Sequence, residues 1–261
     1  MKKLNLAFIA AMLVLSSCAP RVAIKPIPVN TPPEEVIKMA SAGTENVRGL
    51  KASVKVTVQK DGNNPQSIDG VLYIQRPDEF RFTGLAFMGF TVFDLVLTGD
   101  KFYFYRPSDG WLYTGPRDAF KGFLAKNGVQ ADPEIIGRAL FLQKKEGEKY
   151  LVEKTDDGYD IYEAANVEGV LLPLMKAEFN AGMDLERKIF FDGLARPYLY
   201  VAVSGKVSEG GATLPKRLTV KDIAQGVLLT VDFEKYIVNP EGLDKDFTIE
   251  GQELKGIREV Q

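Results

Sequence analysis

Alternation of apolar and polar residues dominates the chain from residue 50 onward. Between residues 50 and 58, apolar side chains occupy every second position, and lysine, serine or threonine fills most positions between them. A period of two places these sets on opposite faces of a strand, so we predict a half-buried strand here. Further strands, separated by turn residues, are predicted at residues 68–75, 79–83, 91–98, 101–106, 150–155, 159–164, 185–191, 198–204, 214–222 and 227–236, with a short edge strand at 244–249.

Helical spacing replaces this alternation in three places. Prolines and acidic residues at 32–35 predict the start of a helix that runs to about residue 47, and two short helices are predicted near residues 119–124 and 135–142. Helices inserted after the fifth or sixth strand favour one strongly curved antiparallel sheet. We therefore predict a mainly β (α+β) fold, in which a single curved antiparallel sheet forms a half-open β-barrel and short helices cover or plug its concave side.

The first 33 residues differ from the rest of the chain. Two lysines, an apolar run over residues 4–15 and two serines precede Cys18, the only cysteine. The run is shorter than the roughly 20 residues of a membrane-spanning helix, and it is typical of a secretory signal. Leu-Ser-Ser-Cys resembles the lipobox of bacterial lipoproteins, which implies cleavage before Cys18 and a covalent lipid on its thiol. The alternative, a free thiol, is disfavoured in an oxidising compartment.

These features divide the N-terminal region into two segments. We expect a signal peptide at residues 1–17 and a lipidated, proline-rich tether at residues 18–33, which carries five prolines. The residue after Cys18 is Ala19, not the aspartate that the lipoprotein family associates with inner-membrane retention. The resemblance therefore implies a lipid anchor in the outer membrane, at its periplasmic face.

The composition narrows the classes of function. The 261 residues include 33 basic and 35 acidic side chains, so no overall positive field is available to attract nucleic acid. The absence of histidine excludes histidine-based triads and zinc ligands. The sequence also contains no phosphate-binding loop and no nucleophile elbow. We expect a non-catalytic monomer with no metal, no nucleic acid partner and no cofactor other than the covalent lipid on Cys18.

One connection between two predicted strands is unusually apolar. Residues 84–90 read Gly-Leu-Ala-Phe-Met-Gly-Phe, whereas connecting loops are normally polar. The large apolar side chains are Leu85, Phe87, Met88 and Phe90. Two interpretations stay open: the loop folds inward and belongs to the core, or it projects as an apolar patch of the kind that marks a membrane or partner site.

The segment around this loop resembles a known family. A strand that ends in Arg-Phe at 81–82, the apolar loop, a strand at 93–98, a Gly-Asp-Lys turn and an aromatic strand at 102–105 are similar to the LolA/LolB superfamily of lipoprotein carriers and receptors. The order is especially similar to its outer-membrane receptor branch, LolB. The resemblance covers residues 50–142, whereas residues 170–184 look like extra material relative to LolB.

The resemblance implies a LolA/LolB-like half-barrel domain over residues 34–261. It further implies a cavity lined by the helices near residues 118–142. For the aromatic residues of the nearby strand, two interpretations stay open: one face, either Phe102 and Phe104 or Tyr103 and Tyr105, lines this cavity, or each residue is ordinary core. Leu85, Phe87, Met88 and Phe90 then form the loop that inserts into the membrane or transfers cargo.

The function expected from these features is that of a membrane-anchored periplasmic lipoprotein. It would bind acyl chains or lipoproteins and help their localisation or insertion at the outer membrane, with acylated lipoproteins or a periplasmic carrier as partners. The alternative is a non-catalytic structural or interaction subunit of a cell-envelope complex on the same fold. An open apolar cavity would favour the first function, and a filled interior would favour the second.

Overall fold

The computed structural model describes residues 31–60, 62–75, 79–126, 134–142, 149–249 and 254–260, and all their strands join one sheet of fourteen. The order across the sheet is β14-β6-β5-β4-β3-β2-β1-β13-β12-β11-β10-β9-β8-β7. The strands are β1 (Gly49–Lys60), β2 (Gln66–Gln75), β3 (Glu79–Leu85), β4 (Thr91–Thr98), β5 (Lys101–Arg106), β6 (Trp111–Pro116), β7 (Lys149–Lys154), β8 (Gly158–Val167), β9 (Val170–Asn180), β10 (Leu185–Phe191), β11 (Pro197–Glu209), β12 (Ala212–Asp222), β13 (Val227–Val238) and β14 (Gly256–Glu259).

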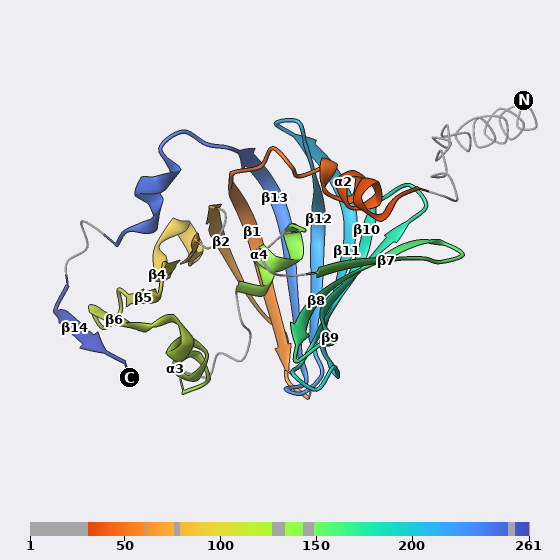
Figure 1. Ribbon diagram of the computed structural model, residues 1–261. Helices are drawn as coiled ribbons and strands as arrows, with labels where there is room; N and C mark the ends of the chain where they lie inside the picture. Colours follow the sequence, from red (N-terminus) through yellow and green to blue (C-terminus); the bar gives the residue numbers. More distant parts are fainter. Residues whose placement is uncertain are drawn as a thin grey trace, which may run out of the picture.

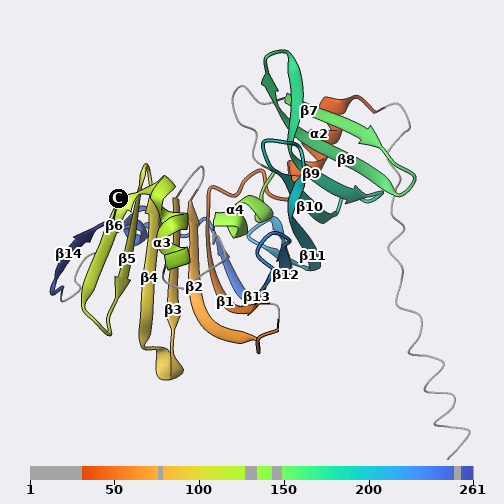
Figure 2. The ribbon, with the colours of Figure 1, turned by 90° about the horizontal axis from the view of Figure 1, so that it is seen from below.

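The sheet is strongly curved and does not close (Figures 1 and 2). Viewed from below, the strands follow an open arc, with β14 and β7 at its two ends and α3 and α4 on its inner side (Figure 2). Every pairing is antiparallel except that of β14 with β6, which is parallel. The predicted mainly β, half-open architecture is therefore confirmed, although the sheet contains more strands than the sequence indicated.

Strand β1 shows how the alternating pattern builds the concave face. Leu50, Ala52, Val54 and Val56 are buried, while the residues between them are only partly covered. The strand pairs with β2 on one side and with β13 on the other, which places it near the middle of the sheet. The apolar face thus follows from the period of two, as predicted.

Three short helices lie against this face. They are α2 (Pro33–Ala42), α3 (Phe120–Lys126) and α4 (Glu134–Leu140), and α3 follows a 3₁₀ turn, η2 (Arg117–Ala119). Helix α2 ends five residues before the predicted end, and only Val36 on it is fully buried. The two later helices each bury an apolar face, with Phe120, Phe123 and Leu124 on α3 and Ile135, Ile136, Ala139 and Leu140 on α4.

One prediction about an individual segment was wrong. Residues 244–249 do not form an edge strand: they belong largely to the 3₁₀ helix η3 (Leu243–Phe247), whose Leu243 and Phe247 are buried against Val96 on the outer face of the sheet. The added edge strand is β14, further along the chain. Residues 170–184, for which no strand was predicted, contain β9, which lies between β8 and β10 in the sheet.

Candidate functional site

The apolar loop between β3 and β4 projects into solvent. Phe87, Met88 and Phe90 are 90%, 78% and 67% exposed, and they lie on or next to the 3₁₀ turn η1 (Phe87–Gly89). Leu85 differs from them, because it is the last residue of β3, pairs with Thr91 and is half-buried. Of the two interpretations left open by the sequence, the inward-folded loop does not hold for the three exposed side chains.

The loop is held in one compact conformation. The amide of Ala86 donates to the carbonyl of Phe90 at 2.7 Å, and the amide of Gly89 donates to the carbonyl of Ala86 at 3.0 Å. Met88 has a φ of 65°, in the left-handed region that costs a non-glycine residue roughly 1–2 kcal/mol. The backbone therefore presents large apolar side chains at the tip of a hydrogen-bonded turn, at a conformational cost.

Next to the loop, a row of aromatic rings crosses the concave face. Phe82 on β3 makes an edge contact with Phe93 on β4, and Phe93 stacks on Phe104 of β5 at 5.7 Å between ring centroids. Phe104 then lies close to Tyr113 of β6. Phe102 and Phe104, rather than Tyr103 and Tyr105, therefore face the helices. Phe93, the second ring of this row, lies three residues after the exposed Phe90.

Two glycines leave room for these rings. A Cβ on Gly84 would lie 2.6 Å from the ring of Phe93, and one on Gly70 would lie 2.4 Å from the ring of Phe82. Because these distances are too short for any side chain, glycine is needed for the rings to lie against the neighbouring strands.

Helices α3 and α4 cover the aromatic row and the adjacent strands. Phe123 of α3 contacts Phe102, Phe104 and Tyr113 with centroid distances of 5.2 to 5.5 Å. Helix α4 is tied to the sheet by the fully buried Lys188 of β10, whose Nζ donates to the carbonyls of Arg138 at 2.8 Å and Phe141 at 2.6 Å. Side-chain packing and a few such bonds, not strand pairing, hold the helices in place.

A cavity of about 210 Å³ lies between these helices and strands β11 to β13. Its floor is apolar and buried, and is formed by Leu124, Ile135, Leu199, Val220, Val227 and Leu229. Its mouth is polar, with Lys121 and Arg138 from the helices and Asp222 and Gln225 from the end of β12 and the following turn. A second cavity, of about 420 Å³, lies between α2, α4 and strands β9 to β12.

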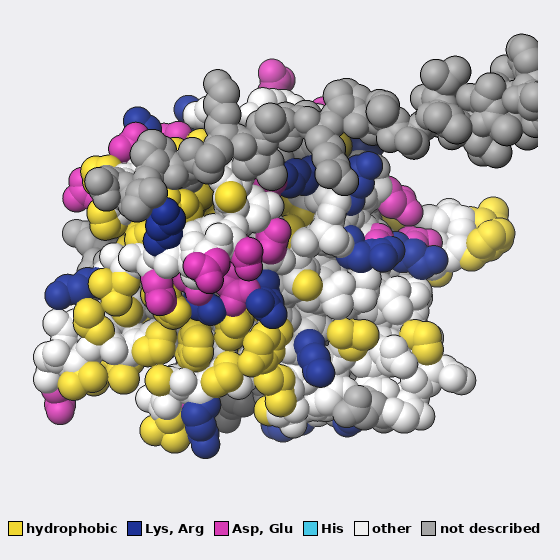
Figure 3. Space-filling model, turned by 90° about the vertical axis from the view of Figure 1, so that its right-hand side faces the viewer, with side chains coloured by type: hydrophobic (Ala, Val, Ile, Leu, Met, Phe, Trp, Pro, Cys, Tyr) yellow, Lys and Arg dark blue, Asp and Glu magenta, His cyan; other side chains and the backbone are white. Residues whose placement is uncertain are grey.

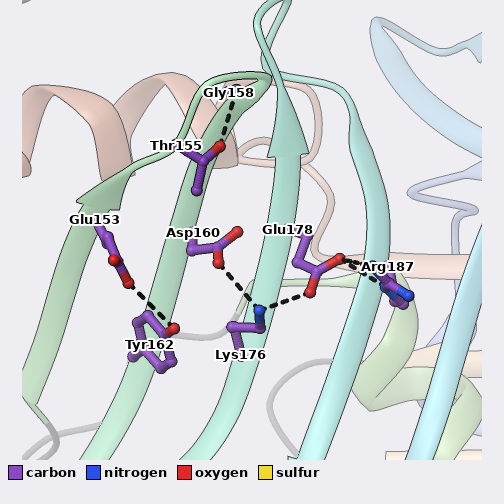
Figure 4. Close-up of polar contacts among 8 residues, drawn as sticks. All are labelled: Glu153, Thr155, Gly158, Asp160, Tyr162, Lys176, Glu178 and Arg187. Atoms are coloured by element: carbon purple, nitrogen blue, oxygen red, sulfur yellow. Dashed lines mark hydrogen bonds and ion pairs between the residues drawn. The ribbon is translucent and has the colours of Figure 1, made fainter.

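The outer face of β8 to β10 carries a row of ion pairs (Figure 4). Lys176 Nζ lies 3.0 Å from Asp160 Oδ2 and 2.7 Å from Glu178 Oε1, and Arg187 Nε donates to Glu178 Oε2 at 2.6 Å. Burial alone would raise the pKa of Glu178, but the hydrogen bonds from Lys176 and Arg187 outweigh it and lower that pKa. Figure 3, which views the molecule from the right-hand side of Figure 1, shows charged side chains gathered across the middle of that view, with hydrophobic side chains below them. The ion pairs on this face are partly buried between neighbouring strands, and they are not part of the apolar site.

The part of the chain that the structure describes offers no group of three metal-ligating side chains. None of its helices has the length and apolar character needed to cross a membrane. The lipidation site predicted at Cys18, with its signal peptide, lies outside the described residues.

Comparison with known proteins places the fold among LolA-like proteins. No family model and no curated protein sequence matches the chain. Among solved structures, a DUF1329 family protein from Desulfovibrio piger is similar with a TM-score of 0.62 and 12% identity, and the match covers 84% of this chain and 97% of that one. A LolA superfamily protein from Nitrosomonas europaea gives a TM-score of 0.57 at 11% identity, with coverages of 84% and 99%.

A third similar structure is a Vibrio parahaemolyticus domain named for outer membrane lipoprotein sorting, with a TM-score of 0.59, 10% identity and coverages of 82% and 95%. At these identities the similarity concerns the fold alone. It supports the resemblance to the LolA part of the superfamily at the level of architecture, and it does not single out LolB.

Sequence reasoning found the loop and the helices but missed the cavity mouth. Lys121, Arg138 and Asp222 were not among the site residues predicted from the sequence. These residues come together only because α3 and α4 fold back over strands that lie more than fifty residues later in the chain.

Proposed function

We propose that this chain is a lipid-anchored, non-catalytic protein of the cell envelope, held through Cys18 at the periplasmic face of the outer membrane. It takes up acyl chains of lipoproteins or of other lipids between the sheet and helices α3 and α4. The β3–β4 loop touches the bilayer while the chains are transferred. The observation that carries this proposal is the exposed Phe87, Met88 and Phe90, directly followed by the aromatic row under α3.

The volume of the cavity beneath α3 and α4 limits the length of acyl chain that it can take up. Pockets for drug-sized ligands usually measure about 300–1,000 Å³, and the cavity beneath α3 and α4 is smaller. A long acyl chain in this cavity therefore requires these helices to move away from the sheet. Such a movement breaks side-chain contacts and the bonds from Lys188, and it leaves the strand pairing intact.

The experiment measures uptake and transfer of an acylated peptide. The chain carrying Cys18→Ser, which prevents acylation, is loaded with a fluorescent N-palmitoyl peptide and mixed with vesicles of phosphatidylethanolamine and phosphatidylglycerol. We expect Phe87→Asp with Phe90→Asp to leave folding and peptide binding unchanged. Transfer should slow about tenfold or more, because two large apolar side chains no longer enter the bilayer.

Leu194→Asp is the matched control, because Leu194 is 71% exposed in the β10–β11 turn, away from the loop. It should not change transfer. Unfolding of the double variant, or equal slowing by the control, would contradict the role of the loop.

A second function is favoured by the filled interior. Phe120, Phe123 and Ile136 occupy the space between the helices and the sheet, as expected for a structural or interaction subunit of an envelope complex. If the chain takes up no acylated peptide at all, this second function replaces the first.

A further inference from the structure

Met88, at the tip of the β3–β4 loop, is far more exposed than the other methionines that the structure describes. It is 78% exposed, whereas Met175 is 3% exposed. Met39 and Met183 are partly buried against the core. An oxidant in solution reaches an exposed thioether sooner than a buried one, so Met88 is the methionine of the described chain that is most open to oxidation.

The backbone at position 88 does not explain why a methionine stands there. Met88 has a φ of 65° and the following Gly89 has a φ of 80°, so two successive residues lie in the left-handed region. Glycine adopts this conformation without the steric cost that a side chain brings. Strained residues of this kind concentrate at functional sites. What position 88 provides to the loop is therefore its side chain.

That side chain lies between two aromatic residues that the proposed function places in contact with the bilayer. Phe87 and Phe90 are both exposed, and the hydrogen bonds between Ala86 and Phe90 and between Gly89 and Ala86 hold all of them on one compact turn. A group at position 88 therefore approaches the bilayer together with the two rings. A polar group that enters hydrocarbon without a hydrogen-bond partner is unfavourable.

We propose that Met88 is an oxidation site, and that its sulfoxide weakens the contact of the β3–β4 loop with a bilayer. The oxidant is hydrogen peroxide. One peroxide oxygen forms a bond to the sulfur, the O–O bond breaks, and the other oxygen leaves as water with both protons. The sulfur loses the two electrons that the peroxide gains, and an apolar thioether becomes a polar sulfoxide. The inference rests on the proposed function, because it names a modification that regulates the same loop.

Selective oxidation is measured first. The full chain carrying Cys18→Ser is treated with hydrogen peroxide, and the oxidised fraction of each methionine is followed by mass spectrometry of its peptides. We expect Met88 to react about tenfold faster than the buried Met175 and several times faster than Met39 and Met183. In guanidinium, which unfolds the chain, the four rates should converge. A folded-chain rate for Met88 no higher than that of Met39 or Met175 would overturn the assignment.

The effect on the loop is measured next, after catalase has removed the peroxide. Binding of the chain to vesicles of phosphatidylethanolamine and phosphatidylglycerol is measured by sedimentation, and transfer of the N-palmitoyl peptide is measured as above. Oxidation should weaken vesicle binding and slow transfer by about threefold, because one of three apolar side chains becomes polar. Methionine sulfoxide reductases, one for each epimer of the sulfoxide, should restore both.

Variants assign the effect to one residue. Met88→Leu keeps an apolar side chain that peroxide does not oxidise, so peroxide treatment should change neither vesicle binding nor transfer by this variant. Met39→Leu is the matched control, because it removes a methionine of α2 and should keep the full sensitivity to peroxide. Met88→Gln carries a polar side chain and should weaken vesicle binding and transfer without any peroxide.

The outcomes separate this inference from the proposed function. Sensitivity to peroxide that persists in Met88→Leu would overturn the inference. If oxidation of Met88 changes neither readout while Phe87→Asp with Phe90→Asp slows transfer, the inference fails and the proposed function stands. If the chain takes up no acylated peptide but loses vesicle binding when Met88 is oxidised, the inference is supported and transfer of acyl chains is defeated.

Discussion

At the scale of single residues, the most consequential polar contact is the pair formed by Arg81 and Asp94 on the outer face. Arg81 Nε donates to Asp94 Oδ1 at 2.9 Å, and the Asp94 side chain is only 1% exposed. Burial alone would lower the pKa of Arg81, but Asp94 outweighs it and raises that pKa. Arg81 Nη1 also donates to the carbonyl of Asp246 at 2.5 Å, which links β3 to η3.

We predict that Asp94→Ala lowers the free energy of unfolding by about 3 kcal/mol, because it leaves a largely buried guanidinium without its partner. Asp232→Ala provides the comparison, since its pair with Arg217 is exposed and should be worth less than about 1 kcal/mol. Urea unfolding of both variants measures the difference. Similar losses would show that the Arg81 pair behaves as a surface pair.

At the scale of elements, the row of ion pairs on β8 to β10 makes stability depend on pH. The folded state lowers the pKa of Glu178, so its stabilising contribution is complete above the unfolded value of about 4.3. That contribution disappears as the pH falls through the folded pKa, where the carboxylate becomes protonated.

We therefore predict that Glu178→Gln is less stable than the natural chain by about 1 kcal/mol at pH 7, and that the difference vanishes toward pH 3. Thermal unfolding across this pH range measures it. The exposed Glu45, in the connection between α2 and β1, serves as a control, and Glu45→Gln should show no such trend. A difference for Glu178→Gln that persists at low pH would mean that packing, not charge, is responsible.

The strands also show which parts of the fold the sequence could reveal. Strand β1 was predictable because its alternation is regular and both neighbours are antiparallel. Strand β9 was missed because residues 170–175 are a continuous apolar run that contains Pro173, which normally argues against a central strand. The structure accommodates this proline opposite Ala164, where the register shifts at a bulge.

The sequence revealed less of the candidate functional site than it did of the strands. Loop composition marked residues 84–90, but their exposure depends on the register of β3 with β4, which pairs Leu85 with Thr91 and leaves the residues between them outside the ladder. The register of this hairpin is set locally by its turn, whereas the packing of α3 and α4 on β11 to β13 is a long-range property. The cavity mouth therefore had no local signature in the sequence.

At the scale of the whole molecule, the C-terminal segment determines how one edge of the sheet ends. After β13 the chain crosses the outer face through η3, and β14 then pairs with β6. Arg258 of β14 lies 4.0 Å from the centre of the Trp111 ring. At the opposite edge, β7 exposes Lys149, Glu153 and Lys154, and such charges disfavour pairing with another sheet.

Because both edges are protected in this way, we predict that the full chain is monomeric and that deletion of residues 254–261 causes self-association. The deletion leaves the amides and carbonyls of β6 unpaired at an edge that also carries Trp111 and Tyr113, and such an edge is a template for another strand. Light scattering during gel filtration measures the mass of each form. Arg258→Ala keeps the strand and removes only the contact with Trp111, so it should remain monomeric; self-association of that variant would mean that the cation, not the strand, protects the edge.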